Sequence, residues 1–294
     1  MNTQYDIPDE GGRVDVHHHM VPSFYLEALD LAGVDATVFP SWTPEKSLKM
    51  MEGLGITKAI LSISSPGVWF GQDGEARQLA RRCNEYAAEL CKRYPARFGA
   101  LAILPFPDLE GALEELSYGL DTLRLHGVLL LTNVGGKYVG DPEFDALMTE
   151  INRRKARVFL HPNHVPSEDE NASLYGWAEY PLDVARAYLR MVYNDVLVRY
   201  SDIDWTLAHA GGAVPFLAER LGKAHYAKEG GLRWGRIIRD LTAKRNRGLE
   251  LAKKMSYETA ESADPITLAA LRRLVGPEQI LFGSNFPWGA EVPG

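Results

Sequence analysis

The chain has 294 residues, 46% hydrophobic and 24% charged, which is the composition of a globular protein with ample apolar surface for a core. Lys and Arg number 32 against 39 for Asp and Glu, a net charge of −7. With no long run of basic residues, this acidic balance excludes nucleic acid and anionic membranes as partners. The length suits one α/β barrel of roughly 250 residues.

The ends and the cysteines indicate the compartment. The N-terminal segment MNTQYDIPDEGG is polar and acidic, unlike a secretory signal or a transit peptide. No apolar run approaches the ~20 residues needed to span a bilayer. Cys83 and Cys91 lie more than two turns apart in one helical pattern, roughly 12 Å of rise, so we expect free thiols. Together these features predict a cytoplasmic protein.

Short apolar runs alternate with longer amphipathic stretches along the chain. Several of the runs are near-continuous Val, Ile and Leu, which is typical of parallel strands buried on both faces. The eight strand candidates are Arg13–His17, Ile56–Ile63, Phe98–Leu104, Gly127–Leu131, Arg157–His161, Asp204–His209, Met255–Thr259 and Ile280–Gly283.

Helical patterns fill the intervals between these runs. Apolar residues in 76–91 follow the three-and-four spacing of one helix face. Asp264 followed by Pro265 indicates an N-cap and the first helical position. The other predicted helices are Leu109–Leu123, Phe144–Ile151, Leu182–Tyr200, Val214–Ala227 and Ile266–Leu274.

Strands that alternate with helices predict right-handed crossovers and a (β/α)8 TIM-type barrel. A doubly wound open sheet is less favoured, because no G-x-G-x-x-G follows the first strand. We expect residues 1–294 to form one barrel domain. The sequence ends soon after the eighth strand and leaves no length for a final covering helix. A truncation, an omitted tail or a partner over that face would each explain this.

Histidines follow several of the predicted strands. His17 and His19 project to the same side of the first strand, because side chains alternate along an extended chain. His161 and His209 end the fifth and sixth strands. The carboxyl ends of barrel strands meet at one rim, and neutral imidazole is a good ligand for zinc and similar ions. The sequence therefore predicts a metal site at the C-terminal rim.

Motifs along nearly the whole chain are similar to those of one enzyme family. They are DVHHH, SSPGV, LLTN, FLHP, LAHAGG, SYETAESADP and ILFGSNFPW. The chain resembles the amidohydrolase superfamily, in the branch of metal-dependent decarboxylases around aminocarboxymuconate-semialdehyde and 6-methylsalicylate decarboxylases. This resemblance implies a distorted barrel with one divalent metal ion, zinc rather than manganese. It assigns His17, His19 and His161 as metal ligands and gives His209 a catalytic role, activating water or holding substrate.

The last motif departs from the family pattern at one position. Where the family has an aspartate in G-[ST]-D-[YF]-P, this chain has Asn285. The resemblance places Asn285 at both a metal-ligand and a catalytic position. An amide oxygen can still coordinate a metal, but an amide cannot shuttle a proton as a carboxylic acid does. A laboratory substitution, a natural homologue of low activity and a chemistry that needs no acid remain open explanations.

The implied activity is metal-dependent, non-oxidative decarboxylation of a hydroxylated aromatic or related unsaturated carboxylic acid, impaired by Asn285. A hydrolase of an ester, a lactone or a C–C bond would use the same ligands, with His209 as the base. A barrel that binds a metal or metabolite without turning it over is the third hypothesis.

Aromatic residues are expected to surround the barrel mouth and to bind a flat carboxylic acid, namely Trp42, Phe70 and Trp288. Arg220 matches an arginine that, in the aminocarboxymuconate branch, reaches across a dimer interface to the substrate carboxylate. This match implies a homodimer, although a solvated helix arginine would have the same pattern. Glu258, near the end of the seventh strand, either supports the site or is polar filler.

Overall fold

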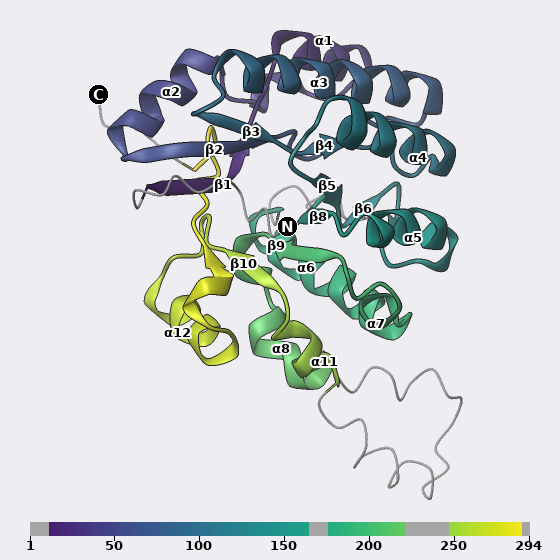
Figure 1. The fold of residues 1–294 in the computed structure, drawn as a ribbon, viewed down its shortest axis with the longest axis vertical. Helices are drawn as coiled ribbons and strands as arrows, with labels where there is room; N and C mark the ends of the chain where they lie inside the picture. The colour runs from purple at the N-terminus through teal and green to yellow at the C-terminus, as the bar shows by residue number, and fades with distance from the viewer. Residues whose placement is uncertain (1–11, 165–175, 222–246, 290–294) are drawn as a thin grey trace, which may run out of the picture.

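The computed structural model describes residues 12–164, 176–221 and 247–289, and its strands and helices alternate along the chain (Figure 1). All strand pairs are parallel except one short hairpin. The strands are β1 (Arg13–His19), β2 (Ile56–Ser62), β3 (Phe98–Ala100), β4 (Ala102–Ile103), β5 (Val128–Leu131), β6 (Asn133–Val134), β7 (Lys137–Tyr138), β8 (Arg157–His161), β9 (Asp204–Leu207), β10 (Ser256–Glu258) and β11 (Ile280–Leu281).

The parallel strands are arranged as a closed ring. The strands form two sheets, β1-β2-β3 and β11-β10-β9-β8-β5-β4. The chain passes from the first sheet to the second at Leu101, the one residue between β3 and β4. The other seam joins β1 to the chain after β11: Val16 N–H donates to Phe282 O at 3.0 Å, and His19 N–H donates to Phe286 O at 2.7 Å. Each of the eight predicted strands therefore has a counterpart in the barrel.

The predicted third strand differs from the observed structure in one respect. The run 98–104 is divided, because β3 pairs with β2 whereas β4 pairs with β5. The antiparallel hairpin of β6 and β7 was not predicted, since each strand has two residues and shows no detectable alternation.

Helices lie outside the strands (Figure 1). They are α1 (Ser23–Leu31), α2 (Pro44–Gly53), α3 (Asp73–Arg93), α4 (Leu109–Ser117), α5 (Asp145–Arg153), α6 (Gly176–Tyr193), α7 (Val196–Arg199), α8 (Val214–Leu221), α11 (Arg247–Ala252) and α12 (Pro265–Leu274). Within the described residues, none of these helices has the length and hydropathy of a membrane span.

Several helix predictions are confirmed, with different ends. The Asp264 side chain caps α12 by accepting from the Ile266 and Thr267 N–H groups at 2.9 and 3.1 Å. The predicted helix Leu182–Tyr200 is two helices, α6 and α7, separated by a turn in which Asp195 has φ +59°. The predicted helix Val214–Ala227 begins where α8 begins, and its part beyond residue 221 lies outside the described residues.

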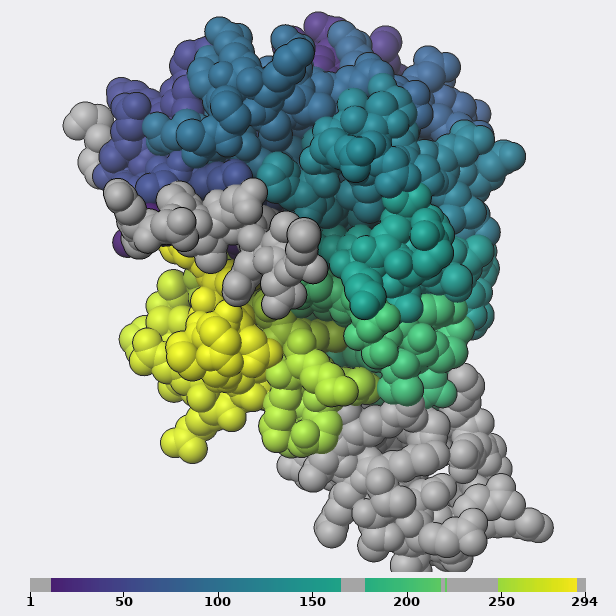
Figure 2. Space-filling model, viewed as in Figure 1, coloured from purple at the N-terminus to yellow at the C-terminus, as the bar shows by residue number. Residues whose placement is uncertain are grey.

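Two clusters of buried side chains form the core. One gathers side chains from β1, β2, α1 and α3, and the other gathers side chains from β5, β8, α5 and α6. In the space-filling view the N-terminal half, purple to teal, lies above the green and yellow C-terminal half (Figure 2). Cys83 is buried, Cys91 is partly buried, and both are free thiols, as the sequence predicted.

Candidate metal centre

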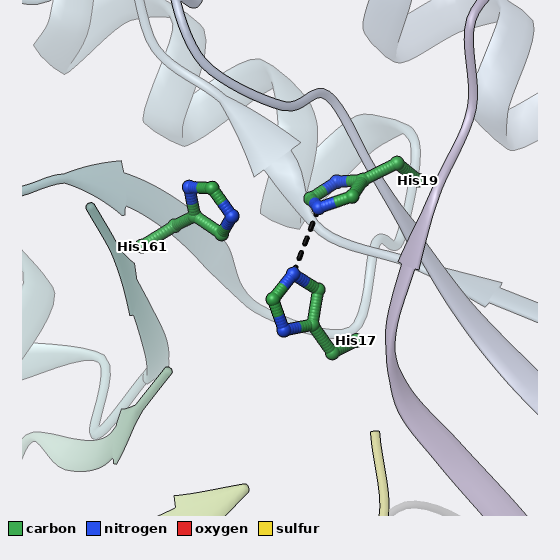
Figure 3. Close-up of side chains that lie close together, drawn as sticks. All are labelled: His17, His19 and His161. Atoms are coloured by element: carbon green, nitrogen blue, oxygen red, sulfur yellow. Dashed lines mark hydrogen bonds between the residues drawn. The ribbon is translucent and has the colours of Figure 1, made fainter. Parts of the chain in front are cut away.

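Three histidines from two distant strands converge inside the barrel. His17 and His19 are on β1 and His161 ends β8, and their rings face one another (Figure 3). Ring centroids are 4.6 Å apart for His17 and His19, and 5.0 Å from each of these to His161. One ligand atom of each lies within 4.8 Å of the others. The three predicted histidine ligands are thus brought together.

Each ring has a partner on its Nδ1 atom. His17 Nδ1 donates to Glu258 Oε1 at 2.8 Å, and His19 Nδ1 pairs with Ser62 Oγ at 3.1 Å. His161 Nδ1 donates to the Pro162 carbonyl oxygen at 2.7 Å. Such contacts fix the tautomer and the ring orientation of metal-binding histidines, and they leave Nε2 as the ligand atom.

The free ring nitrogens show what the site can hold. His17 Nε2 and His19 Nε2 are 2.8 Å apart (Figure 3). His17 Nε2 is an acceptor when its Nδ1 carries the proton donated to Glu258, so His19 Nε2–H can donate to it while His19 Nδ1 accepts from the Ser62 hydroxyl. A metal ion that displaces this proton would be bound by both Nε2 atoms. The donor set therefore fits a divalent cation, and three imidazoles suit zinc and other first-row ions.

Burial keeps these imidazoles neutral. His17, His19 and His161 are at most 3% exposed. Burial, reinforced by the neighbouring imidazoles, holds the pKa of each well below its ordinary value. At neutral pH each ring therefore keeps the lone pair with which it would bind a metal ion.

Glu258, the last residue of β10, connects two of the histidines. Its Oε1 accepts from His17 Nδ1 and also from the His209 N–H at 2.5 Å, and its Oε2 accepts from the Ala260 N–H at 2.7 Å. Burial raises the pKa of the Glu258 carboxyl, while the His209 and Ala260 N–H groups act in the opposite direction. The sequence left Glu258 undecided between support and filler, and the structure shows that it orients His17.

His209 lies beside the three-histidine cluster. Its ring centroid is 5.0 Å from that of His17 and 5.7 Å from that of His161. Its Nδ1 donates to the Ala260 carbonyl oxygen at 3.0 Å, so Nε2 is left as an acceptor. His209 and Ala210 have φ of +51° and +58°, a left-handed backbone that costs L-residues roughly 1–2 kcal/mol each. Strain of this kind is typical of functional sites.

Asn285 is close to the cluster through its backbone. Its N–H donates to the His17 carbonyl oxygen at 2.9 Å, and its own carbonyl accepts from the Trp288 N–H at 2.8 Å. Asn285 is buried and has φ +56°, a conformation that Asn and Asp adopt more readily than other side chains. The backbone therefore places residue 285 at the seam between the first and last strands, beside two of the histidines.

The predicted substrate-binding aromatics occupy three different environments. Trp288 lies against the site, with its ring 5.3 Å from that of His19. Trp42 is buried, and its indole N–H donates to Ser47 Oγ at 2.8 Å. Phe70 lines a cavity between α1 and α3 that none of the histidines lines. Among the three, Trp288 is the aromatic that contacts a histidine of the cluster, and the roles of Trp42 and Phe70 stay predictions.

Arg220 lies in the last turn of α8 and is exposed. An exposed side chain is available to a second copy of the chain or to solvent. Its predicted contact with a substrate carboxylate across a dimer stays a prediction.

A buried network behind β1 was missed by the sequence reasoning. Asp15 accepts from the Ser284 N–H at 3.0 Å and from the His18 Nδ1 at 2.9 Å, and His18 Nε2 pairs with Ser47 Oγ at 2.8 Å. All of these groups except Ser284 are fully buried. The available signal was Asp15 itself, a carboxylate between Val14 and Val16 in a buried part of the strand.

The chain matches a family model described as amidohydrolase over residues 14–291. The 6-methylsalicylic acid decarboxylase of Aspergillus aculeatus is 35% identical over 288 residues, which cover 94% of this chain and 84% of that protein.

Solved structures have the same fold. An amidohydrolase II structure superposes with a TM-score of 0.82 at 27% identity, covering 94% of this chain and 87% of that one. The 5-carboxyvanillate decarboxylase of Novosphingobium aromaticivorans, solved with manganese and 4-hydroxy-3-methoxy-5-nitrobenzoic acid, has a TM-score of 0.79 at 19% identity, with 96% and 88% covered. The predicted α/β barrel class is confirmed.

Replacing Glu258 by Gln is expected to weaken metal binding about 10- to 100-fold, because the amide removes the charge that holds His17 Nδ1–H. Competition with a chelating dye would measure this affinity. The matched control is Glu250→Gln on α11, which changes a carboxylate that is 60% exposed and pairs with Lys253. Equal metal affinity in the Glu258 and Glu250 variants would contradict the orienting role.

Proposed function

The chain belongs to the amidohydrolase family, and we propose that it is a metal-dependent carboxy-lyase that removes CO2 from a hydroxylated aromatic acid. The observation that carries this proposal is the convergence of His17, His19 and His161, each held through Nδ1 by its own partner. The 35% identity to a 6-methylsalicylic acid decarboxylase over 94% of the chain supports the substrate class.

We propose that His17, His19 and His161 hold one divalent ion, with the Asn285 amide oxygen as a further neutral ligand. Three imidazoles and an amide favour zinc over manganese, which prefers oxygen-rich sites. When bound, the ion would hold the substrate carboxylate with its neighbouring hydroxyl and stabilise developing negative charge.

The chain's own residues would orient the substrate and manage protons. The carboxylate leaves as CO2, its bonding electron pair stays on the ring carbon, and that carbon then takes a proton. His209 Nε2, an acceptor beside the cluster, is suited to hold the substrate hydroxyl. The Trp288 ring next to His19 offers an apolar surface for the flat substrate ring. Asn285 cannot deliver the proton, so turnover of this chain would be slow.

Metal content and CO2 release test the proposal together. Protein purified without chelators is expected to contain about one zinc per chain by mass spectrometry and to release CO2 from 6-methylsalicylate. His161→Ala should lose both, because two imidazoles cannot complete the site. Release of an alcohol from ester or lactone probes, without CO2 from the aromatic acid, would favour the hydrolase instead. Metal without either reaction would favour a binding protein.

Replacing Asn285 by Asp tests the missing acid. This change is expected to raise the rate of CO2 release by ~10²–10⁴, the usual worth of a general acid. Metal content should be measured in parallel, so that better chemistry is distinguished from better metal loading. Asn152→Asp, at an exposed amide bonded to the Asp202 N–H, is the matched control. A rate that Asn285→Asp leaves unchanged would rule out a proton donor at this position.

We further propose that two copies form a homodimer in which Arg220 of one binds the substrate carboxylate in the other. Arg220→Gln should then raise KM with little change in kcat, because a guanidinium–carboxylate pair is lost. Mixing this variant with His161→Ala would create mixed dimers with one site holding both His161 and Arg220. At substrate concentrations well below the KM of the Arg220 variant, recovery of CO2 release is expected on mixing, and light scattering would report the dimer. No recovery on mixing would contradict sharing of the site.

A further inference from the structure

A cavity lies at the end of the barrel opposite to the cluster of His17, His19 and His161. It has a volume of about 470 Å³ and is formed where β5, β8 and β9 begin. This size is within the usual range of roughly 300–1,000 Å³ for small-molecule sites. His161 ends β8 whereas Arg157 begins it, so the cavity and the metal centre are at opposite ends of the same strand.

The cavity is lined by an unusual density of cations. Arg153, Arg154, Lys155 and Arg157 all line it, and they come from one short stretch of a chain whose net charge is −7. The acidic residues around them are fewer: Asp121 and Asp204 line the cavity, and Glu150 pairs with Arg153 and Arg154. Four cations and three carboxylates give a local charge of +1. In keeping with this field, the Arg154 guanidinium lowers the pKa of the Asp121 carboxyl, with smaller effects of Arg124 and Arg153.

Two of the guanidinium groups are held in place. The Arg154 and Arg157 side chains are each 14% exposed. Arg154 donates to Asp121 at 2.5 Å and to Glu150 at 2.7 Å, and Arg157 donates to Asp204 at 3.0 Å. Side chains fixed in this way lose little rotamer entropy when a ligand binds, because the two guanidinium groups already hold their positions.

Lys155 differs from these arginines. It is exposed, and within the part of the chain that the structure describes it has no ion-pair partner. It follows α5 with φ +50°, a left-handed position that Gly or Asn usually occupies at a helix end. A lysine there costs backbone free energy and leaves an exposed ammonium group at the cavity. Arg124, next to the lining residue Leu125, has φ +58° and adds a second strained cation nearby.

We propose that this cavity binds a small phosphate-bearing anion, held mainly by Lys155, while Arg153, which Glu150 holds through two hydrogen bonds, and the fixed Arg154 and Arg157 supply further positive charge. Ammonium and guanidinium groups together suit a multiply charged tetrahedral anion, which can compete with the carboxylates already present. The site is separate from the metal centre and does not depend on the proposed activity.

Calorimetric titration of inorganic phosphate into the metal-loaded full chain, at constant ionic strength, tests the site. Saturable binding is expected. Lys155→Asn removes the charge and keeps a side chain that tolerates φ +50°, so Kd should rise about tenfold or more while the fold is kept. Lys92→Asn, at an exposed lysine in the last turn of α3, is the matched control and should leave Kd unchanged.

Three results of the phosphate titrations would overturn the proposal. One is the absence of saturable phosphate binding, and another is an equal Kd for the Lys155 and Lys92 variants. The third is binding that His161→Ala abolishes and Lys155→Asn leaves intact, which would place the phosphate at the metal centre. A second titration with succinate distinguishes the anion class: weaker binding than phosphate supports the proposal, and tighter binding that needs Lys155 overturns the phosphate assignment.

Discussion

Closure of the barrel between its first and last strands is the constraint on which the site depends. The backbone of β1 bonds directly to residues 282–286, and Ser284 is also tied to the buried carboxylate of Asp15. This seam fixes His17 and His19 on one side and Asn285 on the other. Because β1 pairs with β2 on its opposite edge, the strand cannot shift without breaking both sets of bonds. Local chain geometry and the shape of the site are thus determined by the same hydrogen bonds.

One buried carboxylate has an influence beyond its own strand. Glu258 accepts a hydrogen bond from an imidazole on β1 and another from the backbone after β9, where the chain turns at His209. A buried carboxylate is costly unless its oxygens are paired, and here three N–H groups pair them. The hydrogen bonds that pair this one carboxylate therefore fix the relative position of His17 and His209, which are far apart in the sequence.

Most elements, and the position of the histidines at the strand ends, were predictable from the sequence because they depend on local patterns. The assignment of His17, His19 and His161 as metal ligands came from the family resemblance and stays a proposal. Apolar runs gave the strands, and the alternation rule placed His17 and His19 on the same side of one strand. The role of Glu258 was not predictable, because its contact with His17 spans 241 positions and leaves no periodic trace. The break at Leu101 and the β6–β7 hairpin depend on which neighbour each short segment pairs with. Pairing of this kind is set by packing of the whole barrel rather than by propensity.

The two core clusters meet at the histidines. Val16 and Met20 of the β1 region belong to one cluster, which also includes Phe159 of β8, whereas Leu160, next to His161, belongs to the other. An ion shared by His17, His19 and His161 would consequently connect residues next to both core clusters, to which β8 contributes alternate side chains. Metal binding there would stabilise the folded barrel as a whole, since an unfolded chain cannot bring the three ligands together. Metal loading would then raise the free energy of unfolding of the barrel as well as equip it for chemistry.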